Sequence, residues 1–178
     1  MKRTLWNITL ASVATLVAYV ALYAIWGAIL SGLNRPTLAL FLVAAMTTLA
    51  FGFVLLAISK IRGSVGEREV LADYKDGAYT SLSDDFRLVL KREARTLLAI
   101  AAVAVCCFAL NTFDKVVFER KTISVVTLLF APLCLFDTCI PVPFVGYALS
   151  ALLDCVAYLA FLLLYRKKKY NYWRKSRA

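Results

Sequence analysis

The chain has 178 residues, of which 62% are hydrophobic and 18% charged, and its formal net charge is +10. This apolar surface is too large for one water-soluble core, so the composition excludes a soluble globular protein. The basic residues flank the apolar runs instead of forming one surface, which argues against nucleic acid binding. We therefore predict an all-α, polytopic membrane protein in which residues 1–178 form a single transmembrane domain.

The first two predicted spans cover residues 5–30 and 37–58. The first is longer than the ~20 residues that cross a bilayer. It also exceeds the ~7–15 apolar residues of a cleaved signal peptide, so we expect it to remain as an anchor. Gly32 and Pro36 break the helix between the two spans.

Residues 59–95 form the only long polar segment, and we expect them in the cytoplasm. Eight basic and seven acidic residues nearly cancel here, which is typical of a docking surface with salt bridges rather than of a basic arm. Helix-capping patterns at 64–67 and 81–84 predict two short helices. The second is expected to continue from Asp84 into the third span, 96–112, because no Gly or Pro intervenes.

The stretch before the last span is apolar but short. Residues 122–136 would form only about 22 Å of helix, and Pro141 and Pro143 prevent a continuous helix into the last span, 144–165. We expect 122–143 to re-enter the membrane as a broken hairpin that opens to the outer side. A shallow connection at the outer interface is the alternative.

The distribution of basic residues predicts the topology. Four spans plus the hairpin place 17 of the 21 Lys and Arg residues on one side of the membrane, whereas five spans would divide them almost equally. Basic residues near span ends remain in the cytoplasm. The four-span arrangement, in the cell membrane with both termini cytoplasmic, is therefore predicted.

A polar face is predicted in the last span. Asp154 lies near its middle, where inserting an aspartate costs about 2.5–3.5 kcal/mol. Ser150 and Tyr158 lie one turn away on either side, and Tyr147 flanks them, so this face is expected to contact protein. Asp154 is either a buried hydrogen-bonding group or a carrier of protons or cations, and in the second case Asp137 of the hairpin would line the same route.

The tail, residues 166–178, alternates basic and aromatic residues directly after the last span. Each Lys or Arg near an anionic leaflet gains about 1 kcal/mol, and aromatic rings favour the headgroup zone. The tail is therefore expected to lie along the anionic inner leaflet. The side chains expected to contact lipid headgroups are Arg166, Lys167, Lys168, Lys169, Tyr170 and Trp173.

Small residues recur at four-residue spacing at three spans. They are Ala28 and Gly32 at the end of the first, Ala44, Thr48 and Gly52 in the second, and Ala102 and Cys106 in the third. Small side chains let helices approach closely. The pattern fits both a tightly packed monomer and a dimer.

The sequence contains no pattern typical of catalysis or of a metal site. It has no His, and three of its five Cys lie within apolar spans. Cys134 and Cys139 are close enough in sequence to pair in an oxidising compartment, but buried thiols are favoured. We therefore expect no cofactor, no metal and no enzyme activity; a membrane enzyme built on the aspartate pair Asp137 and Asp154 is the alternative.

Two functions agree with these features. The first is a non-enzymatic accessory or assembly subunit that acts through helix packing and the 59–95 segment, with a protein partner or a second copy of itself. The second is a small transporter or channel in which Asp154 and the hairpin line the route. The first is favoured because the spans contain one acidic and no basic residue, whereas solute routes usually have more polar lining.

Overall fold

The computed structural model describes residues 2–31, 36–62, 72, 82–118, 130 and 142–175. These residues form four long helices: α1 (Lys2–Ser31), α2 (Pro36–Ile61), α4 (Leu82–Phe118) and α6 (Pro143–Lys175). Each helix contains a stretch that is long and apolar enough to cross a membrane. The predicted all-α membrane architecture with four spans is confirmed.

Two of the helices begin at a proline. α2 starts at Pro36 and α6 at Pro143. Proline is tolerated in the first turn because its missing N–H would have no acceptor within the helix there. The prolines that separate the apolar runs in the sequence therefore mark the starts of two spans.

α4 is an unbroken helix of 37 residues. At 1.5 Å per residue it is about 55 Å long, well beyond the ~30 Å of a hydrocarbon core. Its first turns contain Asp85, Arg87 and Lys91, and its apolar part follows. The prediction that the helix at Asp84 continues into the third span is confirmed.

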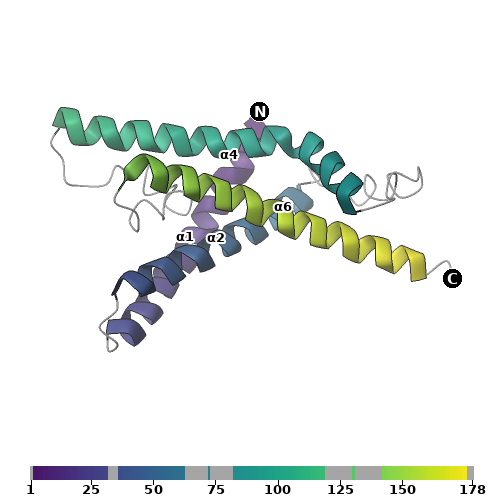
Figure 1. Ribbon diagram of the computed structural model, residues 1–178, viewed down its shortest axis with the longest axis horizontal. Helices are drawn as coiled ribbons and strands as arrows, with labels where there is room; N and C mark the ends of the chain where they lie inside the picture. The colour runs from purple at the N-terminus through teal and green to yellow at the C-terminus, as the bar shows by residue number, and fades with distance from the viewer. Residues whose placement is uncertain are drawn as a thin grey trace.

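The helices form two antiparallel pairs that cross each other (Figure 1). α1 pairs with α2, and α4 pairs with α6. α2 also packs on α6, and the two run in the same direction, because Gly52 meets Ala157 while Lys60 lies over Tyr165, further along both helices. The start of α1, the end of α2, the start of α4 and the end of α6 therefore lie at one end of the bundle.

Gly52 lies where α2 crosses α6. A Cβ atom at this position would lie 2.8 Å from the carbonyl carbon of Ala157 and 2.9 Å from the backbone nitrogen of Tyr158. Both separations are shorter than real Cβ contacts, so the two backbones can approach this closely only at a glycine. Ala44 and Thr48 on the same face of α2 are buried as well. The small-residue face of α2 is thus used within the chain.

The small residues of α4 have a different environment. Ala102 and Cys106 are both exposed on the outer side of the helix. Inside the bundle, α4 contributes Val89, Ile100 and Cys107 to a core that also contains Phe51 and Leu55 of α2. The small residues of α2 therefore face other helices inside the bundle, whereas those of α4 lie on its outer surface.

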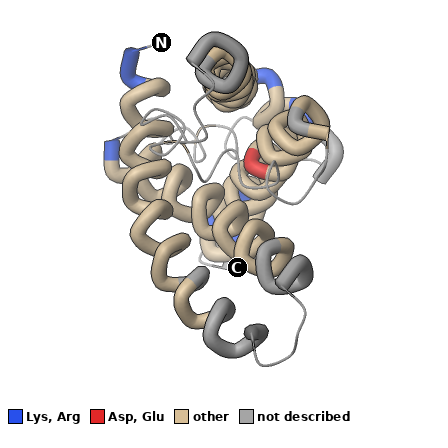
Figure 2. Tube along the Cα trace, turned by 90° about the vertical axis from the view of Figure 1, so that its left-hand side faces the viewer, with Lys and Arg blue, Asp and Glu red and all other residues tan. Residues whose placement is uncertain are grey.

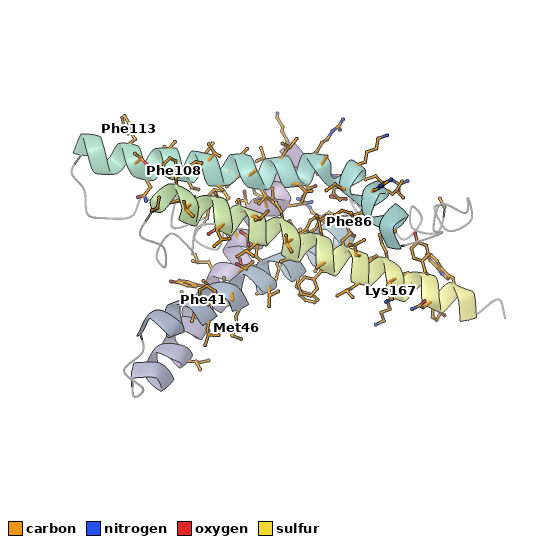
Figure 3. All side chains as sticks on the ribbon, in the orientation of Figure 1. Phe41, Met46, Phe86, Phe108, Phe113 and Lys167 are labelled. Atoms are coloured by element: carbon orange, nitrogen blue, oxygen red, sulfur yellow. The ribbon has the colours of Figure 1, made fainter. Side chains whose placement is uncertain are left out.

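The outer surface of the bundle is apolar. Val17, Leu98 and Leu152 are 71%, 69% and 60% exposed, and most of the helical path contains neither acidic nor basic residues (Figure 2). Phe41 and Met46 of α2 and Phe113 of α4 also project outward (Figure 3). Exposing such a large apolar surface to water would be unfavourable, whereas contact with lipid acyl chains is not.

Several predicted features lie outside the described residues. These are the short helix expected to begin at residues 64–67, apart from position 72, and nearly all of the hairpin 122–143, including Asp137, Cys134 and Cys139. Within the hairpin, Phe130 is described and packs against the core of the bundle. Re-entry of this segment into the membrane stays a prediction.

Candidate functional site

One face of α6 presents polar side chains to the other helices. Its buried members are Tyr147, Ser150, Asp154, Tyr158, Arg166 and Tyr170. Successive members are three or four residues apart, except that Tyr158 and Arg166 are eight apart, with buried Leu162 midway between them. They therefore share one side of the helix. The prediction that Tyr147, Ser150, Asp154 and Tyr158 face protein is confirmed by their burial. The face also extends into the tail, which we did not expect.

Asp154 is completely buried, and neither of its carboxyl oxygens has a hydrogen-bond partner among the described residues. Thr48 of α2 is its polar neighbour from another span, but no hydrogen bond of ordinary geometry joins them. A charged carboxylate is costly to bury in this way unless a proton or cation accompanies it. Asp154 is therefore the strongest candidate in the membrane-spanning part for a group that changes its protonation or binds an ion.

Tyr158 joins α6 to α4. Its hydroxyl donates a hydrogen bond to Oε2 of Glu93, at 3.0 Å. Ser59 of α2 lies beside the same hydroxyl. Polar groups from three helices therefore meet one turn from Asp154, and Glu93 is a partner that the sequence pattern did not indicate.

Tyr147 makes the corresponding contact nearer the other end of the span. Nδ2 of Asn111 on α4 donates a hydrogen bond to its hydroxyl, at 3.0 Å. Phe108 packs edge-on against the rings of both Tyr147 and Phe144, with centroids 5.6 and 5.7 Å away. In Figure 3 Phe108 lies between α4 and α6. Both ends of the α4–α6 contact are therefore held by specific side-chain pairs.

The structure corrects the assignment of Arg166 and Tyr170 to the lipid headgroups. Arg166 is 4% exposed, and its Nε and Nη2 atoms each lie 2.7 Å from Oδ1 of Asp85 on α4. Nη2 also donates to the hydroxyl of Tyr170, at 2.8 Å, and Tyr170 is buried too. α6 continues as a helix through the tail, so both residues keep the four-residue spacing of Tyr158 and Leu162 and face α4. That spacing is the feature of the sequence from which the burial of Arg166 and Tyr170 could have been predicted.

The rest of the predicted lipid-contacting group has a different environment. Lys167 and Lys168 are exposed, while Lys169 and Trp173 are half-buried. Lys167 projects from the last part of α6 (Figure 3). Contact of these four residues with lipid headgroups stays a prediction.

A groove of about 380 Å³ lies between α4 and α6, and Asp154 does not line it. The groove is apolar. Its lining residues are Ala101, Ala104, Val105, Phe108, Phe144, Tyr147, Ala148, Ala151, Leu152 and Cys155. A polar solute would find few hydrogen-bond partners here, whereas an apolar side chain or an acyl chain fits.

Among the described residues, no group of three or more His, Cys, Asp or Glu side chains comes together to hold a metal ion. Comparisons with protein families, curated proteins and solved structures found no match to this chain. The proposals below therefore depend on the contacts, burial and charges of the chain itself.

Proposed function

We propose that this protein is a non-enzymatic accessory or assembly subunit of a membrane, which packs against a partner protein through the outer side of α4 and α6. The observation that carries the proposal is the apolar groove between these two helices. Its floor contains the small side chains of Ala101, Ala104 and Ala151, and larger residues such as Phe144 and Leu152 border it.

The groove extends further along α4. A second hollow of about 360 Å³ shares Ala101 and Cys155 with the first and reaches Leu90. Small residues at such a surface let a second helix approach closely, and close packing drives helix association where lipid surrounds both partners. A partner helix with bulky apolar side chains would fit this hollow.

The interior of the bundle also favours an assembly role. The hydrogen bonds of Tyr147 and Tyr158 and the ion pair of Arg166 connect α6 to α4 at three levels. Gly52 brings α2 against the same helix. Contacts of this kind stabilise one closed arrangement, whereas a transport route requires polar lining that opens.

The 59–95 segment completes the proposal as a cytoplasmic docking surface. In its described part, the first turns of α4 expose Arg87, Lys91 and Arg95. These side chains suit an acidic surface on the cytoplasmic part of the same partner. Deleting residues 66–79 should leave membrane insertion intact and weaken partner binding.

The groove is tested with a photoreactive amino acid at Leu152, which lines it and is exposed. We expect a cross-linked adduct with one protein of defined mass in native membranes, and no such adduct from Val17 on the outer side of α1. Ala148→Leu should abolish the adduct by filling the groove. Ala160→Leu, on an exposed position of α6 outside the groove, should leave it unchanged.

Three results would contradict this proposal. The first is equal cross-linking from Val17, which would indicate random collisions. The second is an adduct with lipid alone, which would indicate an acyl-chain groove. The third is persistence of the protein adduct in the Ala148→Leu variant.

A second candidate function is proton- or cation-linked transport through Asp154. The observation that favours it is the complete burial of both carboxyl oxygens without a hydrogen-bond partner in the described bundle. Such a group is uncommon in a span unless it has a functional role.

For this candidate, Asp154→Asn is expected to abolish ion-driven flux in reconstituted vesicles and to preserve helicity and thermal stability. The amide keeps the size and the hydrogen-bonding capacity of the side chain but cannot ionise. Asp154→Glu, which keeps the carboxyl group, should retain part of the flux. Unchanged flux in the Asp154→Asn vesicles would leave Asp154 a packing residue only.

A further inference from the structure

A basic and aromatic pocket lies at the inner end of the bundle, on the side of α6 that faces α2. It encloses about 350 Å³ and is lined by Lys60, Tyr165, Lys168, Lys169 and Tyr172. The four residues of α6 are spaced at i, i+3, i+4 and i+7, so they form one face of the helix. Lys60 closes the pocket from the end of α2.

The pocket is partly organised by its own contacts. The ammonium nitrogen of Lys60 lies 4.6 Å from the centre of the Tyr165 ring, in a cation–π arrangement. Three lysines line the pocket, and none of the five lining residues is acidic. An anion placed between Lys60 and Lys168 would be attracted by both positive charges and would reduce their mutual repulsion.

The neighbouring arginine does not belong to this pocket. Arg166 points to α4 and is paired with Asp85 at 2.7 Å. Its charge is therefore compensated on the opposite side of α6. Lys60 and Lys168 place positive charge on the α2 side, where they line the pocket from two different helices.

The pocket lies where the hydrocarbon core ends. The apolar run of α2 stops just before Lys60, and that of α6 stops at Tyr165. Exposed tyrosines such as Tyr172, at 67% exposure, are typical of the headgroup layer. Basic pockets between spans at this depth suit lipid phosphate, for which lysine is a common ligand.

We propose that this pocket binds the phosphate headgroup of an anionic phospholipid in the inner leaflet, with Lys60, Lys168 and Lys169 as cationic ligands and Tyr172 as a hydroxyl donor. The bound lipid would join the end of α2 to α6 and stabilise their crossing at Gly52. The proposal does not depend on the partner protein proposed above.

The test uses the purified full-length protein in a neutral detergent, with lipid binding measured by native mass spectrometry. Phosphatidylglycerol is titrated against phosphatidylcholine as the zwitterionic reference. The double variant Lys60→Gln, Lys168→Gln should bind phosphatidylglycerol about 30-fold more weakly, because two favourable lysine–phosphate interactions are removed. The variant Lys60→Arg, Lys168→Arg keeps both charges and should retain most of the affinity.

The matched control is the double variant Lys2→Gln, Arg3→Gln. It removes the same charge from exposed positions at the start of α1, outside the pocket. We expect its phosphatidylglycerol affinity to stay within about twofold of the unchanged protein. Circular dichroism establishes that each variant is folded, and Lys168→Gln alone, at an exposed position, should still weaken binding if the double variant unfolds.

Three outcomes would overturn the proposal. An equal loss of affinity in the α1 control would show diffuse attraction of lipid to the whole basic end. Unchanged affinity in the pocket variants would show that the lysines do not bind the headgroup. Displacement of phosphatidylglycerol by low millimolar inorganic phosphate would assign the pocket to free phosphate instead of lipid.

Discussion

Asp85 and Arg166 form a buried ion pair near the end of the α4–α6 contact. The uncharged hydroxyl of Tyr170 accepts a hydrogen bond from the same guanidinium. Both charged side chains are almost fully removed from solvent, at 2% and 5% exposure. Losing one partner would leave the other charge buried and uncompensated, which is usually worse than losing both. The pair thus specifies how α4 and α6 align more than it adds to stability.

At this scale we predict that Arg166→Met lowers the free energy of unfolding by about 3 kcal/mol. The double variant Asp85→Leu, Arg166→Met should be more stable than either single variant because no buried charge remains. Unfolding in mixed micelles with increasing sodium dodecyl sulfate measures both. Arg87→Met, at an exposed position, should have little effect; equal losses for Arg87→Met and Arg166→Met would argue against a specific pair.

At the scale of elements, the close approach of α2 and α6 depends on Gly52. Gly52 allows backbone approach, Phe53 and Phe161 pack edge-on beside it with centroids 5.7 Å apart, and Thr48 brings a hydroxyl to Asp154. A larger residue at position 52 would separate the two helices and enlarge the space around Asp154.

We expect Gly52→Val to destabilise the protein by about 1–3 kcal/mol, because the added methyl groups would overlap the backbone of α6. Ala160→Val, on an exposed position of α6, is the control and should be nearly neutral. Thermal unfolding in detergent, followed by circular dichroism, compares them. If the Gly52→Val variant were as stable as the wild-type protein, α2 and α6 would not make their closest contact at position 52.

For the molecule as a whole, the directions of the helices agree with a chain that crosses the membrane an even number of times. Arg62 at the end of α2 donates a hydrogen bond to Asn7 near the start of α1, at 3.1 Å, and Lys60 lies over Tyr165 of α6. The ends of the helices that carry most of the basic residues therefore meet. This agrees with the distribution of charge in the sequence, from which the orientation is predicted.

We predict that a reporter enzyme active only outside the cytoplasm shows little activity when fused after residue 178 and high activity when inserted at residue 33. Basic residues near span ends hold the first position in the cytoplasm. Comparable expression of both fusions is checked by immunoblotting. Strong activity from the fusion at 178 would favour five spans, with 122–136 crossing the membrane.

Local patterns were sufficient to predict the spans, the unbroken α4 and the protein-facing side of α6 around Asp154. Each depends on hydropathy or on the 3.6-residue period, which act within one segment. The same period, continued two to three turns beyond Tyr158, would also have predicted that Arg166 and Tyr170 are buried. The abundance of charge in the tail made the headgroups appear the better site.

The sequence by itself thus determined that this protein is a four-span helical membrane protein, because apolar length and the satisfaction of backbone hydrogen bonds in lipid depend only on local composition. Only the tertiary structure decided which helices meet. The ion pair joins residues 81 positions apart, Gly52 meets Ala157, and the groove and the lysine pocket each require two helices. Such contacts depend on shape and charge complementarity between distant segments, which no local pattern encodes.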